Sequence, residues 1–373
     1  MGSQGTTARR LGRAPSLTGI RALAIGLVIL VHTNLSVAQG GWIGVDVFFV
    51  LSGFLITSLL LNEYDANGQF SIPKFYMRRI FRLVPAYWAF LLFLVVWAAI
   101  WRSAAFGSWS SEVVTSATYQ MNFFDIGHFP QIGIGQTWSL AIEEQFYLVW
   151  PLLLLLGLKF MSRRVFMGLV VVGIVASFLA TVIMAHHGVS YRRLYYGLDT
   201  NALPLLVGCF AGFMYTGGFG RKISPRLCAL IPLVTMGVLA IFLVGVPEPS
   251  EWAYEGPVQL VCLLTAATLI AILLNANSWV AKILAHPWVV FVGIISYSLY
   301  LWNPFGMLVA RHVATGTVGR AAHLLVGLLL TFGFALASYF LVERFGLRLK
   351  DRFEVARGGG GAPSLTGPAA QSR

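Results

Sequence analysis

The chain has 373 residues, of which 57% are hydrophobic and 11% are charged, and its formal net charge is +12. Soluble globular domains contain about 45–50% apolar and about 25% charged residues. These proportions exclude a soluble enzyme, a disordered chain and a nucleic-acid-binding protein. They indicate an integral membrane protein whose basic residues gather in cytoplasmic loops.

Ten apolar runs follow one another along the chain. Each is close to the roughly 20 residues that a helix needs to cross about 30 Å of hydrocarbon. The sequence therefore predicts an all-α integral membrane protein with about ten transmembrane helices, the shortest of which contains Pro204. The runs cover residues 18–37, 42–62, 83–101, 138–157, 165–185, 199–215, 227–246, 257–275, 287–310 and 323–343.

The basic residues are distributed unevenly between the two sides of this arrangement. With the N-terminus in the cytoplasm, 20 Lys and Arg residues fall in cytoplasmic segments and five fall outside. This bias predicts cytoplasmic termini and a multi-pass protein of the plasma membrane. A cleaved secretory signal is the alternative interpretation of the first run.

The segments outside the apolar runs have distinct compositions. Residues 1–16 form an N-terminal segment with little to bury, and residues 347–373 form a tail that is first basic and then rich in glycine. Both are expected to lie in the cytoplasm and to be disordered at their extremes. Residues 17–346 form the transmembrane domain. The segment 72–82 is basic and amphipathic, and we expect it to lie on the cytoplasmic surface.

Two ionisable residues share one face of the first run. Arg21 and His32 are eleven residues apart, which is about three helical turns or roughly 16 Å. Arg21 is expected near the cytoplasmic boundary and His32 roughly six residues below the outer end. A snorkelling arginine and a structurally hydrogen-bonded histidine are the alternatives. Two such residues on one face favour a functional interpretation.

Three carboxylates are expected at the depth of His32. Asp46 lies about four residues inside the second run, and Glu143 and Glu144 lie about five residues inside the fourth. A carboxylate beside a histidine can hold its tautomer and stabilise the imidazolium during general-base catalysis. The same arrangement can serve as a proton relay in a transporter.

Three arginines lie close together in the amphipathic segment. Arg78 and Arg79 are four and three residues before Arg82, so all three approach one helix face. Clustered guanidinium groups suit a phosphate-bearing ligand. Attraction to anionic lipid headgroups is the alternative. The histidines and the three cysteines have neither metal-ligand nor disulfide spacing, and no metal site is expected.

Six sequence blocks resemble those of the acyltransferase-3 family of integral membrane O-acyltransferases, whose members act on macrolides, ansamycins and polysaccharides. The resemblance covers almost all of residues 17–346. Each block alone is modestly specific, but here all six occur in order. The blocks are Leu17–Ala24 followed by His32, Gly44–Ile56, Phe75–Pro85, Trp138–Leu148, Ile295–Trp302 and Ser338–Arg344.

The resemblance implies transfer of an acyl group from acyl-CoA, as a co-substrate, to a hydroxyl, without a bound cofactor. His32 would be the general base, supported by Glu143 or Asp46. The residues implied to bind acyl-CoA are Arg21, Arg78, Arg79 and Arg82. Those implied to contact the acceptor or the oxyanion are Glu144, Trp138, Ser139, Tyr297 and Asn303.

One position departs from the family pattern. Many members carry histidine where this chain has Asn303. Because an asparagine side chain carries no proton at neutral pH, a role as a second base is in doubt here. A hydrogen bond to the acceptor or the thioester is the remaining expectation.

The acceptor must be inferred from indirect features. Arginine exceeds lysine, as in GC-rich actinomycetes, the chain ends soon after the last apolar run, and the outer loops other than 102–137 are short. These features favour a compact acceptor, and we expect a polyketide of the macrolide or ansamycin type, or its sugar. A cell-surface polysaccharide is the alternative acceptor, and a proton-coupled transporter is the alternative of a different class.

Overall fold

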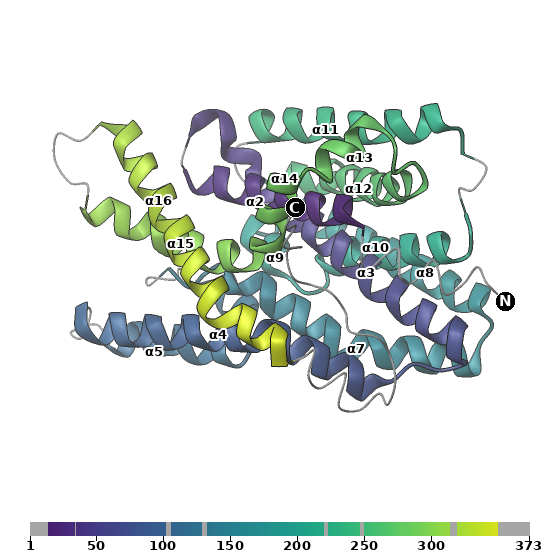
Figure 1. Cartoon of the computed structure of the whole chain (residues 1–373), viewed down its shortest axis with the longest axis horizontal. Helices are drawn as coiled ribbons and strands as arrows, with labels where there is room; N and C mark the ends of the chain where they lie inside the picture. The colour runs from purple at the N-terminus through teal and green to yellow at the C-terminus, as the bar shows by residue number, and fades with distance from the viewer. Residues whose placement is uncertain are drawn as a thin grey trace, which may run out of the picture.

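The computed structural model describes residues 14–33, 35–101, 106–128, 133–219, 223–246, 250–313 and 319–349, which form a helical bundle without strands (Figure 1). Within these residues, eight helices are long and apolar enough to cross a membrane, so this is a multi-pass membrane protein. The elements are α2 (Pro15–His32), η1 (Ser36–Ile43), α3 (Gly44–Asn67), α4 (Ile72–Trp101), α5 (Phe106–Ala117), α6 (Met121–Gly127), α7 (Thr137–Phe160), α8 (Arg163–His186), α9 (Tyr191–Tyr196), α10 (Ala202–Thr216), α11 (Pro225–Gly245), η3 (Glu251–Glu255), α12 (Pro257–Leu274), α13 (Trp279–Leu284), α14 (Pro287–Ile294), α15 (Ser296–Val313), α16 (Arg320–Ser338) and the π-helical turn η4 (Tyr339–Glu343).

All ten predicted apolar runs are helical, but the predicted count of ten full spans is not reproduced. The run at 199–215 becomes α10, whose 15 residues are too few to cross about 30 Å at 1.5 Å per residue. The run at 287–310 is broken into α14 and α15, which meet at a bend of 68° and make a ninth span only if taken together. Most of the predicted disordered ends lies outside the described residues, although Pro15 and Ser16 already belong to α2.

The basic segment 72–82, which was expected on the cytoplasmic surface, is not a separate element. It forms the first three turns of α4, which continues without a break to Trp101. Its apolar face is anchored by Phe75, which is buried in the main hydrophobic core. Because the helix is continuous, Arg79 and Arg82 turn into the bundle and line a cavity.

The segment that follows α2 folds back along that helix. A Cβ atom on Gly41 would lie 2.1 Å from the carbonyl oxygen of Leu27, and one on Gly44 would lie 2.5 Å from that of Ala24. Glycine therefore allows this backbone contact. The turn ends α2 at His32, so His32 lies at the end of the helix and not six residues inside it.

The same fold-back changes the depth expected for Asp46. Gly44 lies beside Ala24, which is eight residues or about 12 Å along α2 from His32. Asp46 follows two residues later, in the first turn of α3, and is buried. The prediction that Asp46 is level with His32 was therefore wrong.

The helix α3 is fixed by a close crossing with α10. A Cβ on Gly53 would lie 2.0 Å from the carbonyl oxygen of Leu205, and one on Gly208 would lie 2.1 Å from that of Val50. Small residues permit such approach between membrane helices. The crossing holds α3 so that Ser52 faces a cavity on the side of α2 and α7.

Candidate active site

A cavity of about 230 Å³, here called the arginine cavity, lies between α2, α3, α4, α7 and α15. It collects polar residues from blocks that are far apart in the sequence. Since a membrane interior penalises unpaired charge, this concentration of polar residues makes the cavity a candidate functional site. The polar and aromatic residues that line it include Arg21, Ser52, Arg78, Arg79, Arg82, Ser139, Glu143, Tyr147, Ser296, Tyr297 and Tyr300.

A chain of short contacts organises the cavity around Glu143. The Ser52 hydroxyl donates a hydrogen bond of 2.5 Å to Glu143 Oε1, and the Tyr147 hydroxyl donates one of 2.9 Å to Ser52 Oγ. The guanidinium of Arg79 lies 3.7 Å from the centroid of the Tyr147 ring. Arg21 Nε donates a hydrogen bond of 3.2 Å to Ser296 Oγ. Arg79 is therefore connected to Glu143 through Tyr147 and Ser52, and Arg21 lies within electrostatic range of Glu143.

The charges in this region are partly balanced. Arg21 and Arg82 lie within electrostatic range of Glu343, a buried residue of η4 whose Oε2 accepts a hydrogen bond of 2.9 Å from Ser298. Arg78 also lines the cavity, but it pairs with Glu63 at 3.3 Å. Three arginines against two carboxylates leave an excess of positive charge that suits a phosphate-bearing ligand.

A second, separate space, here called the histidine pocket, lies at the other end of α2. Its volume is about 200 Å³, and His32, Thr33, Met307, Arg311 and His323 are among the residues that line it. These residues come from the end of α2 and from α15 and α16, which lie side by side in Figure 1.

The contacts of His32 determine which ring nitrogen is available. Nδ1 lies 2.7 Å from the carbonyl oxygen of Val28. A carbonyl oxygen only accepts, so Nδ1 carries the proton and Nε2 keeps a free lone pair. Asn303 Nδ2 lies 3.1 Å from the same Nδ1 and donates a hydrogen bond of 3.4 Å to the same Val28 carbonyl oxygen. Nε2 is therefore the nitrogen that can take a proton.

The structure does not bring His32 and a carboxylate together as the sequence analysis expected. Glu143 lies beside Ser52 and Arg21, at the opposite end of α2 from His32. The reason is that α7 begins inside the bundle and not at its edge. Gln136 donates a hydrogen bond of 2.7 Å to the carbonyl oxygen of Leu301, in the middle of α15. Counting residues from the start of α7 therefore underestimates the depth of Glu143.

The remaining predicted acceptor residues are divided among several places. Ser139 Oγ lies 2.5 Å from the Tyr300 hydroxyl, and the Tyr297 hydroxyl donates a hydrogen bond of 3.1 Å to the carbonyl oxygen of Leu83. Ser139 and Tyr297 both line the arginine cavity. Trp138 is buried, and its ring centroid lies 4.6 Å from that of Tyr195. It is a core residue in this structure, whereas Asn303 contacts His32.

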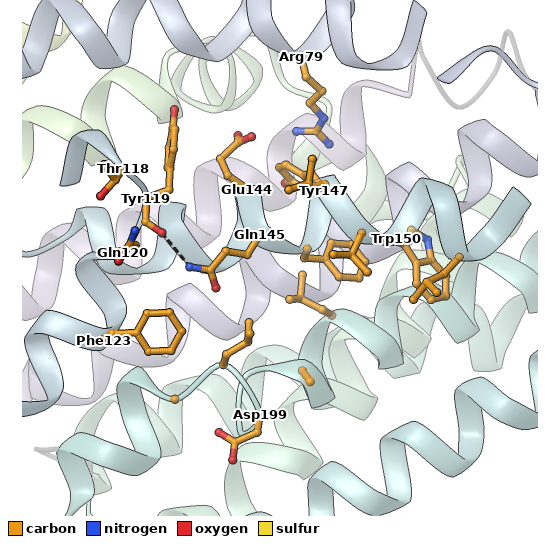
Figure 2. Close-up of a pocket in the computed structure, with 18 of the residues that line it drawn as sticks. Arg79, Thr118, Tyr119, Gln120, Phe123, Glu144, Gln145, Tyr147, Trp150 and Asp199 are labelled. Carbon is orange, nitrogen blue, oxygen red and sulfur yellow. Dashed lines mark hydrogen bonds between the residues drawn. The ribbon is translucent and has the colours of Figure 1, made fainter. Parts of the chain in front are cut away.

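Glu144 faces a third space, the lateral groove, with a volume of about 1170 Å³. Figure 2 shows Glu144, Arg79 and Tyr147 close together in this groove, with Phe123 and Asp199 across it. Arg79 and Tyr147 also line the arginine cavity, so they separate the two spaces. The neighbours Glu143 and Glu144 therefore serve different cavities, because consecutive helical residues point about 100° apart.

Several residues at these sites were not singled out as site residues from the sequence. Ser52 and Glu343 were noted only as parts of the second and last sequence blocks. Arg311 and His323 lie near the ends of α15 and α16, where the pattern resembles ordinary loop charges. Of these residues, only Glu343 could have been recognised as a candidate site residue from the sequence, because it is an acid at the end of an apolar run.

The comparison with known families agrees with this arrangement. The fold and the sites define a multi-pass helical membrane protein with a positively charged internal cavity. A family model described as "Acyltransferase domain" matches residues 15–340. The chain belongs to this family, acyltransferase-3, as the six sequence blocks predicted.

Three similar proteins are named as O-acetyltransferases, two of them for peptidoglycan. The chain is 33% identical over 302 residues to the peptidoglycan O-acetyltransferase OatA of Listeria monocytogenes, covering 78% of this chain and 48% of that protein. It is 32% identical over 354 residues to a putative O-acetyltransferase of Staphylococcus aureus, covering 91% and 58%. It is 31% identical over 348 residues to the putative peptidoglycan O-acetyltransferase YrhL of Bacillus subtilis, covering 88% and 54%. The chain thus spans about half the length of these relatives, and no solved structure matches it.

Proposed function

We propose that this protein is an O-acyltransferase that moves an acyl group from acyl-CoA to a hydroxyl of a cell-wall or cell-surface glycan. The observation that carries the proposal is the distribution of groups along α2. A positively charged cavity surrounds Arg21, and an imidazole with a free Nε2 lies at His32. Family membership supports the reaction class, and the names of the relatives support a glycan as the acceptor.

The arginine cavity is the proposed donor site. Its excess positive charge would bind the phosphates of acyl-CoA through Arg21, Arg79 and Arg82, with Arg78 weakened by its pairing to Glu63. The bias of basic residues supports a cytoplasmic position for this end of α2. The distance along α2 from Arg21 to His32 is about 16 Å, which an extended pantetheine arm can span.

The histidine pocket is the proposed acceptor site. The acceptor hydroxyl gives its proton to His32 Nε2 while its oxygen attacks the thioester carbonyl carbon. The bond between that carbon and sulfur then breaks, and the CoA thiolate takes the proton back from the imidazolium. The carbonyl of Val28 keeps the ring oriented through Nδ1, and Asn303 donates a hydrogen bond to that same carbonyl oxygen.

A polyketide acceptor and proton-coupled transport are the other interpretations carried from the sequence. Two of the relatives are named as peptidoglycan O-acetyltransferases, which favours the glycan over the polyketide. Transport would use the same polar residues as a relay, without forming an ester.

A reconstituted assay separates these activities. Purified protein in lipid vesicles is incubated with acyl-labelled acetyl-CoA and, in parallel, with cell-wall glycan fragments or a macrolide. We expect alkali-labile label on the glycan and none with the His32→Ala variant. Label on the macrolide alone would contradict the glycan proposal. Movement of label across the vesicle without ester formation would contradict acyl transfer.

A further inference from the structure

The polar lining of the histidine pocket is basic and carries no counter-charge. Its titratable side chains are His32, Arg311 and His323, and no carboxylate is among the described residues that line it. The arginine cavity differs, because Glu143 lies among its arginines. Basic groups around an uncompensated space focus a positive potential and favour an anionic ligand.

Arg311 is available to bind such a ligand. It is exposed on α15, and it forms no ion pair with any other described residue. It lies within electrostatic range of the His32 ring. A guanidinium binds a carboxylate or phosphate through two parallel hydrogen bonds. An anion on Arg311 would therefore lie in the same pocket as the proposed base.

The size of the pocket limits what it can enclose. Its volume of about 200 Å³ is below the roughly 300–1,000 Å³ of pockets that surround a drug-sized ligand. The space is suited to a single sugar ring with one substituent. The rest of a glycan would stay outside the pocket.

We propose that the histidine pocket selects an acidic sugar as the acceptor, with the sugar's carboxylate or phosphate on Arg311 and a hydroxyl at His32 Nε2. His323 borders the same space from α16. This inference rests on the proposed function, and it adds the chemical class of the acceptor. In this arrangement Arg311 determines specificity and takes no part in bond making.

A structural role for Arg311 is the competing explanation. A cation in the last turn of a helix stabilises its carbonyl end, and α15 ends at Val313. That role predicts lower stability on substitution and no change in ligand preference.

Ligand binding can be measured without acyl transfer. Saturation-transfer NMR of the full chain in detergent compares methyl glucuronide, its methyl ester and glucose 1-phosphate. We expect the wild type to bind the acid at least tenfold more tightly than the neutral ester, as a charge-assisted hydrogen bond provides. Arg311→Gln should remove this difference while its melting temperature stays close to that of the wild type.

The control is Arg193→Gln, which removes a positive charge that is paired with Asp199 outside the histidine pocket. It should keep the preference for the acid. Equal binding of acid and ester by the wild type, or an equal loss in Arg193→Gln, would overturn the proposal. Stronger binding of glucose 1-phosphate supports the anion site and identifies phosphorylated sugars. Failure of the proposed function would appear as absent transfer in the vesicle assay, and the binding preference can be measured independently of that result.

Discussion

The two spaces at the ends of α2 differ in how their charges are balanced. In the arginine cavity, Glu143 and Glu343 lie near the arginines and hydroxyl groups surround the acids. In the histidine pocket, Arg311 and two histidines have no acid among the lining residues that the structure describes. A buried positive cluster needs nearby acids to be tolerated before its ligand arrives. In a pocket at the end of a helix, solvent and the bound ligand can balance the charge. This difference supports the proposal that the cavity binds a polyanionic donor and the pocket an acceptor that exchanges with water.

Substitution of His32 gives the largest expected effect on catalysis. His32→Ala should lower kcat by about 10²–10⁴-fold, because the positioned base is lost. The KM for acyl-CoA should change little, since the donor would bind about 16 Å away along α2. Steady-state kinetics on monodisperse protein check both values. A variant that keeps most of its kcat would show that the base lies elsewhere, and Glu143→Gln would then be the next variant to measure.

Substitution of the cavity arginines should raise the KM for the donor and leave the KM for the acceptor unchanged. Arg79→Gln with Arg82→Gln should raise the KM for acyl-CoA at least tenfold, because charge-assisted hydrogen bonds contribute about 1.5–3 kcal/mol each. Arg78→Gln is the matched comparison, and its effect should be smaller because Arg78 pairs with Glu63. An unchanged donor KM combined with poor membrane insertion would instead support binding of lipid headgroups.

Asn303 tests how the histidine ring is held. Asn303→Ala removes the amide at 3.1 Å but leaves the contact between Nδ1 and the carbonyl of Val28. A neutral hydrogen bond contributes about 0.5–1.5 kcal/mol, so kcat should fall roughly two- to tenfold. The pH profile of kcat/KM should move as well, which a purely structural role would not cause. An unaltered profile would mean that Val28 alone orients the ring.

The smallest effect is expected outside both sites. Two hydrogen bonds of 2.8 Å from Arg193 hold the pKa of Asp199 below its ordinary value of 3.8. The carboxylate therefore contributes stability at neutral pH that is lost as the pH falls below about 3.8 through the lowered pKa. The pair is partly exposed, so Asp199→Asn should cost at most about 1 kcal/mol at pH 7.

Thermal unfolding of wild type and Asp199→Asn at pH 7 and pH 3 checks this expectation. The difference between the two proteins should shrink at the lower pH, and acyl transfer should be unchanged at pH 7. A large loss of transfer in this variant would implicate the lateral groove, which Asp199 lines, in the reaction.

The sequence predicted which residues belong to the candidate site better than it predicted which of them lie together. Arg21 and Glu143 were selected because charge inside a span is costly, and Arg79 and Arg82 were selected because they approach one helix face. All four line one cavity. The pairing of Glu143 with His32 was wrong, because depth was counted from the ends of apolar runs. The start of α7 is drawn into the bundle by the hydrogen bond from Gln136 to Leu301, and hydropathy does not report such contacts.

By itself, the sequence determined the helical membrane class, the family and the residue types needed for the chemistry, because hydropathy, charge bias and ordered motifs are local properties of the chain. Tertiary structure decided where α2 ends, that 72–82 continues into α4, and that the polar residues divide between two spaces. These outcomes depend on backbone contacts between distant segments, such as Gly44 beside Ala24. Periodicity within one helix carries no information about which neighbour that helix will touch.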